Sequence, residues 1–141
     1  MIIEKTKTKE KMMNYDLILK EACLAGEQAA EAKVPTPMVV AQRKDVLNDN
    51  SEIEKTWFVP QGVCGFAWIE TYEHGNGPFV KYLKANPVNS YECDKKYGGG
   101  YYVYWVRKYG QCYEKKVAYA NAFAAVCQNY GLKVYAGDRL D

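Results

Sequence analysis

The sequence predicts an α+β fold, with a mixed or antiparallel sheet of four to five strands and a long N-terminal and a long C-terminal helix packed on it. Apolar residues recur every three or four positions over residues 9–33 and 112–130, which indicates two amphipathic helices. Residues 63–72 and 101–107 alternate like strands. The expected order α-β-β-β-α-β-α-β favours a sheet with helices on one face.

Length and composition indicate one domain over residues 1–141. The chain contains 48% apolar and 26% charged residues, which are ordinary values for a globular protein. Residues 1–8 are expected to form a flexible leader, with a first short strand as the alternative. Residues 42–55 are polar and are predicted to form a surface loop.

The first predicted helix ends before Pro35 and Pro37, because proline cannot continue a helix. A short strand is expected at 38–41. Strands at 56–59 and 63–72 are expected to pair across a Pro-Gln-Gly turn. In the second of these strands large side chains share one face and small ones the other, which suggests that the helices pack on the small side. The reverse assignment is the alternative. The large-side residues are Cys64, Phe66, Trp68, Glu70 and Tyr72.

The C-terminal half begins with a short helix at 79–85, for which Pro78 supplies the first helical position. Strict alternation in strand 101–107 would place Val103 and Trp105 on one face and Tyr102 and Tyr104 on the other. A last strand is expected at 132–135, followed by a polar tail. The strand, the helix 112–130 and the last strand could form a right-handed crossover.

The helix 112–130 has small residues on its second side as well, at Ala118, Ala122 and Ala125. A helix that is small or apolar nearly all round is often buried on both sides. We therefore expect a homo-oligomer formed through this helix. The alternative is a plain alanine-rich surface.

Several classes of function are disfavoured. The five cysteines include no C-x-x-C pair and there is one histidine, His74, which argues against a zinc site and favours a reducing, cytoplasmic location. No run of 18 apolar residues suggests a membrane span. The glycines at 98–100 form neither a dinucleotide fingerprint nor a P-loop. His74 reads as a surface turn residue and Glu70 as a solvent-facing strand residue, so neither a catalytic set nor a cofactor is expected.

A binding site for an anion is the stronger candidate. Residues 77–141 carry 10 basic and 5 acidic side chains. Arg107 and Lys108 precede a turn with Tyr109 and Gln111 that leads into a helix N-terminus, where backbone N–H groups and the helix dipole favour anions.

The 13 tyrosines, interleaved with cations, fit stacked bases beside phosphates, although core packing would also explain many of these rings. In the predicted site Trp68, Tyr104 or Tyr109 stacks a base. Arg107, Lys108 and Arg139 hold phosphate, and Gln111 reads a polar edge. A frayed C-terminal tail is the alternative for Arg139.

Three segments resemble a family of small uncharacterised proteins of tailed bacteriophages. They are Cys64-Gly65-Phe66-Ala67-Trp68-Ile69, the run from Gly98 to Trp105, and the ending Tyr135-Ala136-Gly137-Asp138-Arg139-Leu140-Asp141, and Gln111 adds to the resemblance. The resemblance covers about residues 35–141 and brings no assigned activity. It implies a viral protein made in bacterial cytosol that acts by binding.

The first functional hypothesis is a non-enzymatic protein that sequesters a small phosphorylated or nucleotide ligand, and in a phage this would counteract host defence signalling. A nucleic-acid-binding protein that uses the basic, aromatic C-terminal half is the alternative. The third hypothesis is a protein–protein inhibitor or structural module whose tyrosines form an interface.

Overall fold

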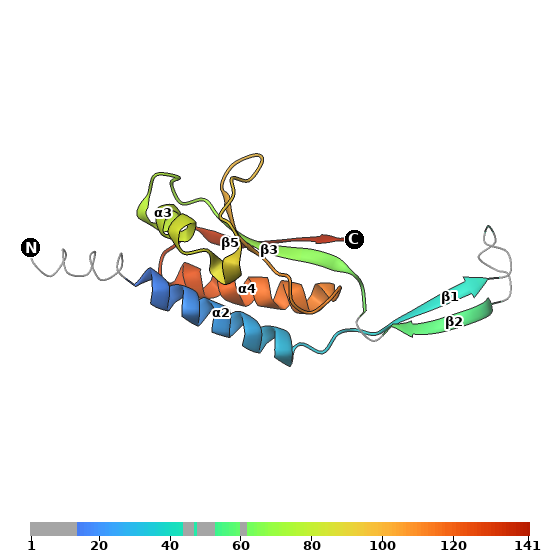
Figure 1. The fold of residues 1–141 in the computed structure, drawn as a ribbon. Coiled ribbons are helices and arrows are strands. Elements are labelled where there is room, and N and C mark those ends of the chain that lie inside the picture. Colours follow the sequence, from blue (N-terminus) through green and yellow to red (C-terminus); the bar gives the residue numbers. More distant parts are fainter. Residues whose placement is uncertain (1–13, 44–46, 48–52, 60–61) are drawn as a thin grey trace, which may run out of the picture.

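The computed structural model describes residues 14–43, 47, 53–59 and 62–141. The predicted leader at 1–8 and the start of the first predicted helix lie outside the described residues. In the rest the α+β class is confirmed, and Figure 1 shows the arrangement of its elements.

Two long helices, α2 (Tyr15–Ala32) and α4 (Tyr113–Asn129), pack side by side (Figure 1). Gly26 of α2 faces the ring of Tyr119, so the helices approach closely at a position without a side chain. The Lys115 ammonium of α4 donates to the carbonyls of Ala30 (2.9 Å) and Lys33 (3.0 Å), which satisfies the C-terminal end of α2. Both predicted long helices are therefore confirmed within the described residues.

The helices cover one face of a three-stranded antiparallel sheet (Figure 1). Its central strand is β3 (Gly65–Thr71), with β4 (Tyr101–Trp105) on one side and β5 (Val134–Leu140) on the other. Since β4 and β5 each run antiparallel to β3, they are parallel to each other. The chain thus crosses from β4 through α4 to β5, as predicted, but with β3 between the two parallel strands.

A separate hairpin is formed by β1 (Met38–Arg43) and β2 (Ile53–Val59), and it extends from one end of the molecule (Figure 1). The predicted pairing of 56–59 with 63–72 is therefore wrong, and the single sheet of four to five strands is two smaller sheets in the described residues. Strand alternation does not specify a partner, because either pairing would satisfy the same backbone groups. The strands also take in residues 42, 43 and 53–55 of the predicted loop, and most of its centre lies outside the described residues.

The last strand is longer than predicted. β5 continues to Leu140 and pairs with the whole of β3, from Thr71 opposite Val134 to Gly65 opposite Leu140. The expected polar tail is thus largely an edge strand. Backbone hydrogen bonds to β3 hold it, so its polar side chains need not be buried.

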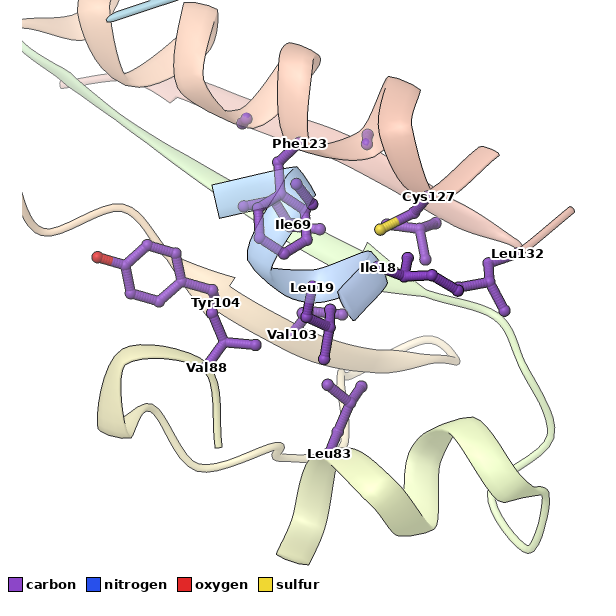
Figure 2. Close-up of a cluster of buried hydrophobic side chains, with 14 of the residues drawn as sticks. Ile18, Leu19, Ile69, Leu83, Val88, Val103, Tyr104, Phe123, Cys127 and Leu132 are labelled. Atoms are coloured by element: carbon purple, nitrogen blue, oxygen red, sulfur yellow. The ribbon is translucent and has the colours of Figure 1, made fainter. Parts of the chain in front are cut away.

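The short helix α3 (Pro78–Ala85) and the 3₁₀ turn η1 (Val88–Ser90) complete the core beside β4. Figure 2 shows side chains of both long helices, the sheet and this segment meeting in one cluster. Five of its residues are at most 2% exposed and come from five different elements. They are Ile18, Ile69, Leu83, Val103 and Phe123.

A bulge in β4 changes which of its side chains are buried. Trp105 lies opposite Trp68 and Tyr104 opposite Ile69, but Glu70 is opposite Tyr102, so one extra residue of β4 occurs between them. Strict alternation, which we expected, is therefore wrong for β4. Because a bulge shifts the phase of a strand, Val103 and Tyr104 are both buried, and Tyr102 and Trp105 lie on the other face.

Candidate functional site

The face of the sheet away from α2 and α4 carries a cluster of aromatic rings. We call this side the open face, and its residues are Phe66, Trp68, Glu70, Tyr72, Tyr102, Trp105, Tyr135, Gly137 and Arg139. The side of β3 that carries the large side chains faces away from the helices, which confirms the prediction. The bulge in β4 adds two further rings to it.

The rings of the open face contact one another across β3 and β4. The indoles of Trp68 and Trp105 are stacked with centroids 4.7 Å apart. Phe66 meets Trp105 edge-on at 6.2 Å, and Tyr102 meets the same indole at 5.6 Å. These four rings are each partly exposed, so they form one continuous aromatic surface.

Glu70 lies in the middle of this surface and is 8% exposed, so the prediction of a solvent-facing glutamate is wrong. Its carboxylate accepts hydrogen bonds from the Trp68 indole N–H (3.0 Å) and the Tyr72 hydroxyl (2.5 Å). The Lys96 ammonium is 3.6 Å from the same carboxylate. The hydrogen bond to Glu70 raises the pKa of Tyr72, and the negative charge of Glu70 raises the pKa of Lys96. The carboxylate therefore fixes the orientation of two rings of the open face.

Gly137 of β5 provides the space that the Trp68 indole occupies. A Cβ atom at this position would overlap the indole ring. The indole thus lies over bare backbone on one side of β3 and against Trp105 on the other. Any larger residue at 137 would force the indole to move.

Cations border the aromatic surface at one end. The Arg139 guanidinium lies 5.1 Å from the centroid of the Phe66 ring, and Arg139 is exposed. The Lys116 ammonium is 5.6 Å from the same ring, donates to the Gly65 carbonyl at 3.3 Å, and belongs to a residue that is 5% exposed. Positive charge therefore lies beside a stacking surface, as a ligand with bases and phosphates would require.

The predicted anion site at the turn before α4 is a separate place. Lys108 forms an ion pair with Glu27 of α2 at 3.0 Å, and the Arg107 guanidinium lies 5.2 Å from the Tyr91 ring. Tyr109 has a positive φ of 73° and packs against the core residue Tyr119 at 6.3 Å. Gln111 is exposed, and its backbone carbonyl accepts a hydrogen bond from the Gly65 N–H at 3.3 Å.

The start of α4 already has partners for some of its polar groups. The Tyr113 N–H donates to the carbonyl of Val63 at 3.1 Å. Glu114 in the first turn accepts the Thr36 N–H at 2.9 Å and brings a negative charge to the end that favours anions. An incoming phosphate would have to compete with both.

The seven predicted site residues therefore do not meet in one site. Trp68 and Arg139 share the open face, with Phe66 beside Arg139. The residues at 107–111 lie at the turn near α2, and Tyr104 is a core residue that is 3% exposed, so its ring cannot stack a ligand in this conformation. Trp105 and Tyr102 were not in the predicted set, because only the bulge brings them beside Trp68.

The described residues contain no group of three or more His, Cys, Asp or Glu residues placed to hold a metal ion. Ala118 of α4 lines a hollow of about 320 Å³ together with Val117 and Asn121. No second copy of the chain is present, so the homo-oligomer remains a prediction.

Comparisons with protein-family models, curated proteins and solved structures give no match to this chain. The resemblance to phage proteins thus remains a prediction. Among the described helices, none has the length and apolar character needed to cross a membrane.

Proposed function

We propose that the open face binds single-stranded nucleic acid by stacking bases on its aromatic rings. The observation that carries this proposal is the continuous, partly exposed surface of Phe66, Trp68, Tyr102 and Trp105 on the side of the sheet away from α2 and α4. Soluble proteins seldom expose a continuous apolar surface unless it binds a partner. Each stacked base contributes roughly 1–3 kcal/mol, whatever its sequence.

The charges around the face support an anionic partner. Arg139 lies next to the Phe66 ring and Lys96 next to Glu70, so cations border the rings at two places. Glu70 has two hydrogen-bond donors and a nearby ammonium, which reduces the repulsion that its charge would exert on phosphate. The 10 basic and 5 acidic residues of segment 77–141 act in the same direction.

A small phosphorylated ligand, such as a nucleotide, is the second candidate. Trp68 and Arg139 were both predicted to hold it, and both lie on the open face. A base on the exposed part of the indole pair would leave its phosphate near Arg139. In a phage, a protein of this kind would sequester a nucleotide signal rather than convert it.

The experiment measures binding of fluorescently labelled 4-mer and 12-mer oligothymidylates, with nucleoside monophosphates and cyclic dinucleotides as competitors. Single-stranded nucleic acid should bind more tightly as its length increases, and the affinity should fall steeply with added salt because counterions are released. A nucleotide-binding protein should instead bind one of the competing nucleotides more tightly than either oligonucleotide. Its affinity for the oligonucleotides should depend little on their length.

Matched variants locate the site. Trp105→Ala should weaken 12-mer binding by about 5- to 100-fold, since one stacking surface is lost. Arg139→Ala should also weaken binding, whereas Arg107→Ala at the other cation site should not. If Arg107→Ala weakens binding and Arg139→Ala leaves it unchanged, the ligand binds at the turn before α4 and the proposal for the open face is wrong. Thermal unfolding of each variant controls for loss of the fold.

A further inference from the structure

The segment before β4 forms a hydrogen-bonded turn at residues 95–99, which we call the tip. Lys95 pairs with Tyr101 as an isolated antiparallel bridge, the Lys96 N–H donates to the Gly100 carbonyl at 2.9 Å, and further along the turn a second hydrogen bond joins Gly99 N–H to the Lys96 carbonyl at 3.1 Å. The three glycines at 98–100 have φ values of 90°, 121° and 80°. Glycine adopts such values without steric cost, so the sequence itself specifies this turn.

The side chains of the tip face solvent. Tyr97 is 100% exposed, which gives its ring no role in stabilising the fold. Lys95 is exposed as well. A hollow of about 570 Å³ is lined by residues 95–99, which are two lysines, a tyrosine and two glycines. These groups suit a phosphate flanked by a base.

The tip is connected to the open face. The Lys96 ammonium is 3.6 Å from the Glu70 carboxylate, and a Cβ atom at Gly100 would lie 3.1 Å from the Tyr72 ring. Figure 1 shows the segment before β4 projecting from the sheet on the side away from α2 and α4. A nucleic-acid strand that runs off the aromatic rings near Glu70 would therefore reach the tip next.

We propose that the tip is a second contact for the same nucleic-acid strand, in which Tyr97 stacks one base and Lys95 binds a neighbouring phosphate. This inference rests on the proposed function of the open face. It predicts a binding site longer than the aromatic cluster alone, because a short oligonucleotide can fill the open face without reaching the tip.

The test uses 4-mer and 12-mer oligothymidylates and the quenching of tryptophan fluorescence in a Trp57→Phe background, where Trp68 and Trp105 report on the open face. Tyr97→Ala should weaken 12-mer binding by about 5- to 100-fold and leave 4-mer binding unchanged. Lys95→Ala should weaken 12-mer binding. It should also reduce the steepness of the plot of log binding constant against log salt concentration by about 0.7, the value for one phosphate contact on a single strand. Lys81→Ala, which removes an exposed lysine of α3, is the charge control and should change neither.

The outcomes separate the two proposals. If neither oligonucleotide binds the starting protein, the proposed function is wrong and this inference is wrong with it. If both bind and Tyr97→Ala affects neither, the open face binds nucleic acid but the tip does not. Equal weakening of the 4-mer and the 12-mer by Tyr97→Ala would also overturn a separate contact at the tip.

Discussion

At the level of single residues, Glu70 links the structure of the open face to its chemistry. A carboxylate that is 8% exposed normally needs compensating hydrogen bonds, and here the donors are an indole and a phenol of the stacking surface. The same bonds hold Trp68 and Tyr72 in fixed orientations. Glu70 is thus a positioning residue for the rings.

Glu70→Gln tests this role directly. The hydrogen bond and the charge of Glu70 both raise the pKa of Tyr72, so the neutral amide should lower that pKa towards its ordinary value of 10. The pKa can be followed by NMR or by absorbance at alkaline pH. Affinity for the 12-mer should change as well, because the rings lose an anchor.

The control is Glu21→Gln on α2. The Tyr130 hydroxyl donates to Glu21 at 2.6 Å, and this bond raises the pKa of Tyr130. The control variant should lower the pKa of Tyr130 and leave that of Tyr72 unchanged. A Tyr72 pKa that does not move in Glu70→Gln would contradict the hydrogen bond on which the role of Glu70 depends.

At the level of elements, the contact between α2 and α4 determines how the helical layer packs. The ring of Tyr119 occupies the space over Gly26, and the same ring contacts Phe123 at 6.2 Å. A glycine inside a helix normally costs about 1 kcal/mol relative to alanine. Its presence in α2 is explained by the close approach of α4.

Gly26→Ala should therefore destabilise the protein in spite of the better helix propensity of alanine. The added Cβ would lie 2.9 Å from the Tyr119 ring, and overpacking of this kind costs roughly 1–3 kcal/mol. We expect a net loss of up to roughly 2 kcal/mol in the free energy of unfolding, measured by urea denaturation, because the overpacking cost exceeds the gain of about 1 kcal/mol in helix propensity. Gln28→Ala on the exposed side of α2 should stay within about 0.5 kcal/mol of the starting protein. Equal effects of the two variants would contradict the close contact.

At the level of the whole molecule, the many tyrosines and cysteines make stability sensitive to alkaline pH. Burial or a hydrogen bond to a carboxylate raises the pKa of eight tyrosines above 10. Burial also raises the pKa of Cys23 and Cys93 above 9, and that of Cys127 to about 12. The eight are Tyr15, Tyr72, Tyr82, Tyr91, Tyr109, Tyr113, Tyr119 and Tyr130.

These shifts all have the same sign. Between its unfolded and folded pKa values, each group keeps its proton in the native state and has lost it in the unfolded state. Rising pH therefore favours unfolding. The contribution of these groups to the free energy of unfolding is complete below about pH 9 and decreases as the pH rises above it. The buried Cys127 and Tyr119 alone should lower the free energy of unfolding by about 2 kcal/mol or more between pH 8 and 11.

Urea denaturation at several pH values measures this effect. Cys127→Ala should reduce the dependence on pH, since one of the two buried groups no longer titrates. A free energy of unfolding that is constant up to pH 11 would contradict the burial of these groups.

The sequence by itself determined the features that depend on local periodicity. Spacings of three and four identified α2 and α4, and alternation in β3 identified its aromatic side, because the backbone of a regular element fixes where each side chain points. Trp68 of the open face was placed on that side in this way, whereas Arg139 was predicted only as a cation of a polar tail.

Only the tertiary structure decided the features that depend on pairing between distant segments. Trp105 and Tyr102 join Trp68 because a bulge shifts the phase of β4, and no pattern within residues 101–107 shows where an extra residue is inserted. Alternation likewise did not reveal that β2 pairs with β1, since backbone hydrogen bonds have similar energies with either partner. The predicted cations Arg107 and Lys108 lie at the turn before α4, beside Tyr91 and Glu27, whereas Arg139 lies on β5 beside Phe66. Segments this far apart in the sequence meet or separate only through the tertiary packing.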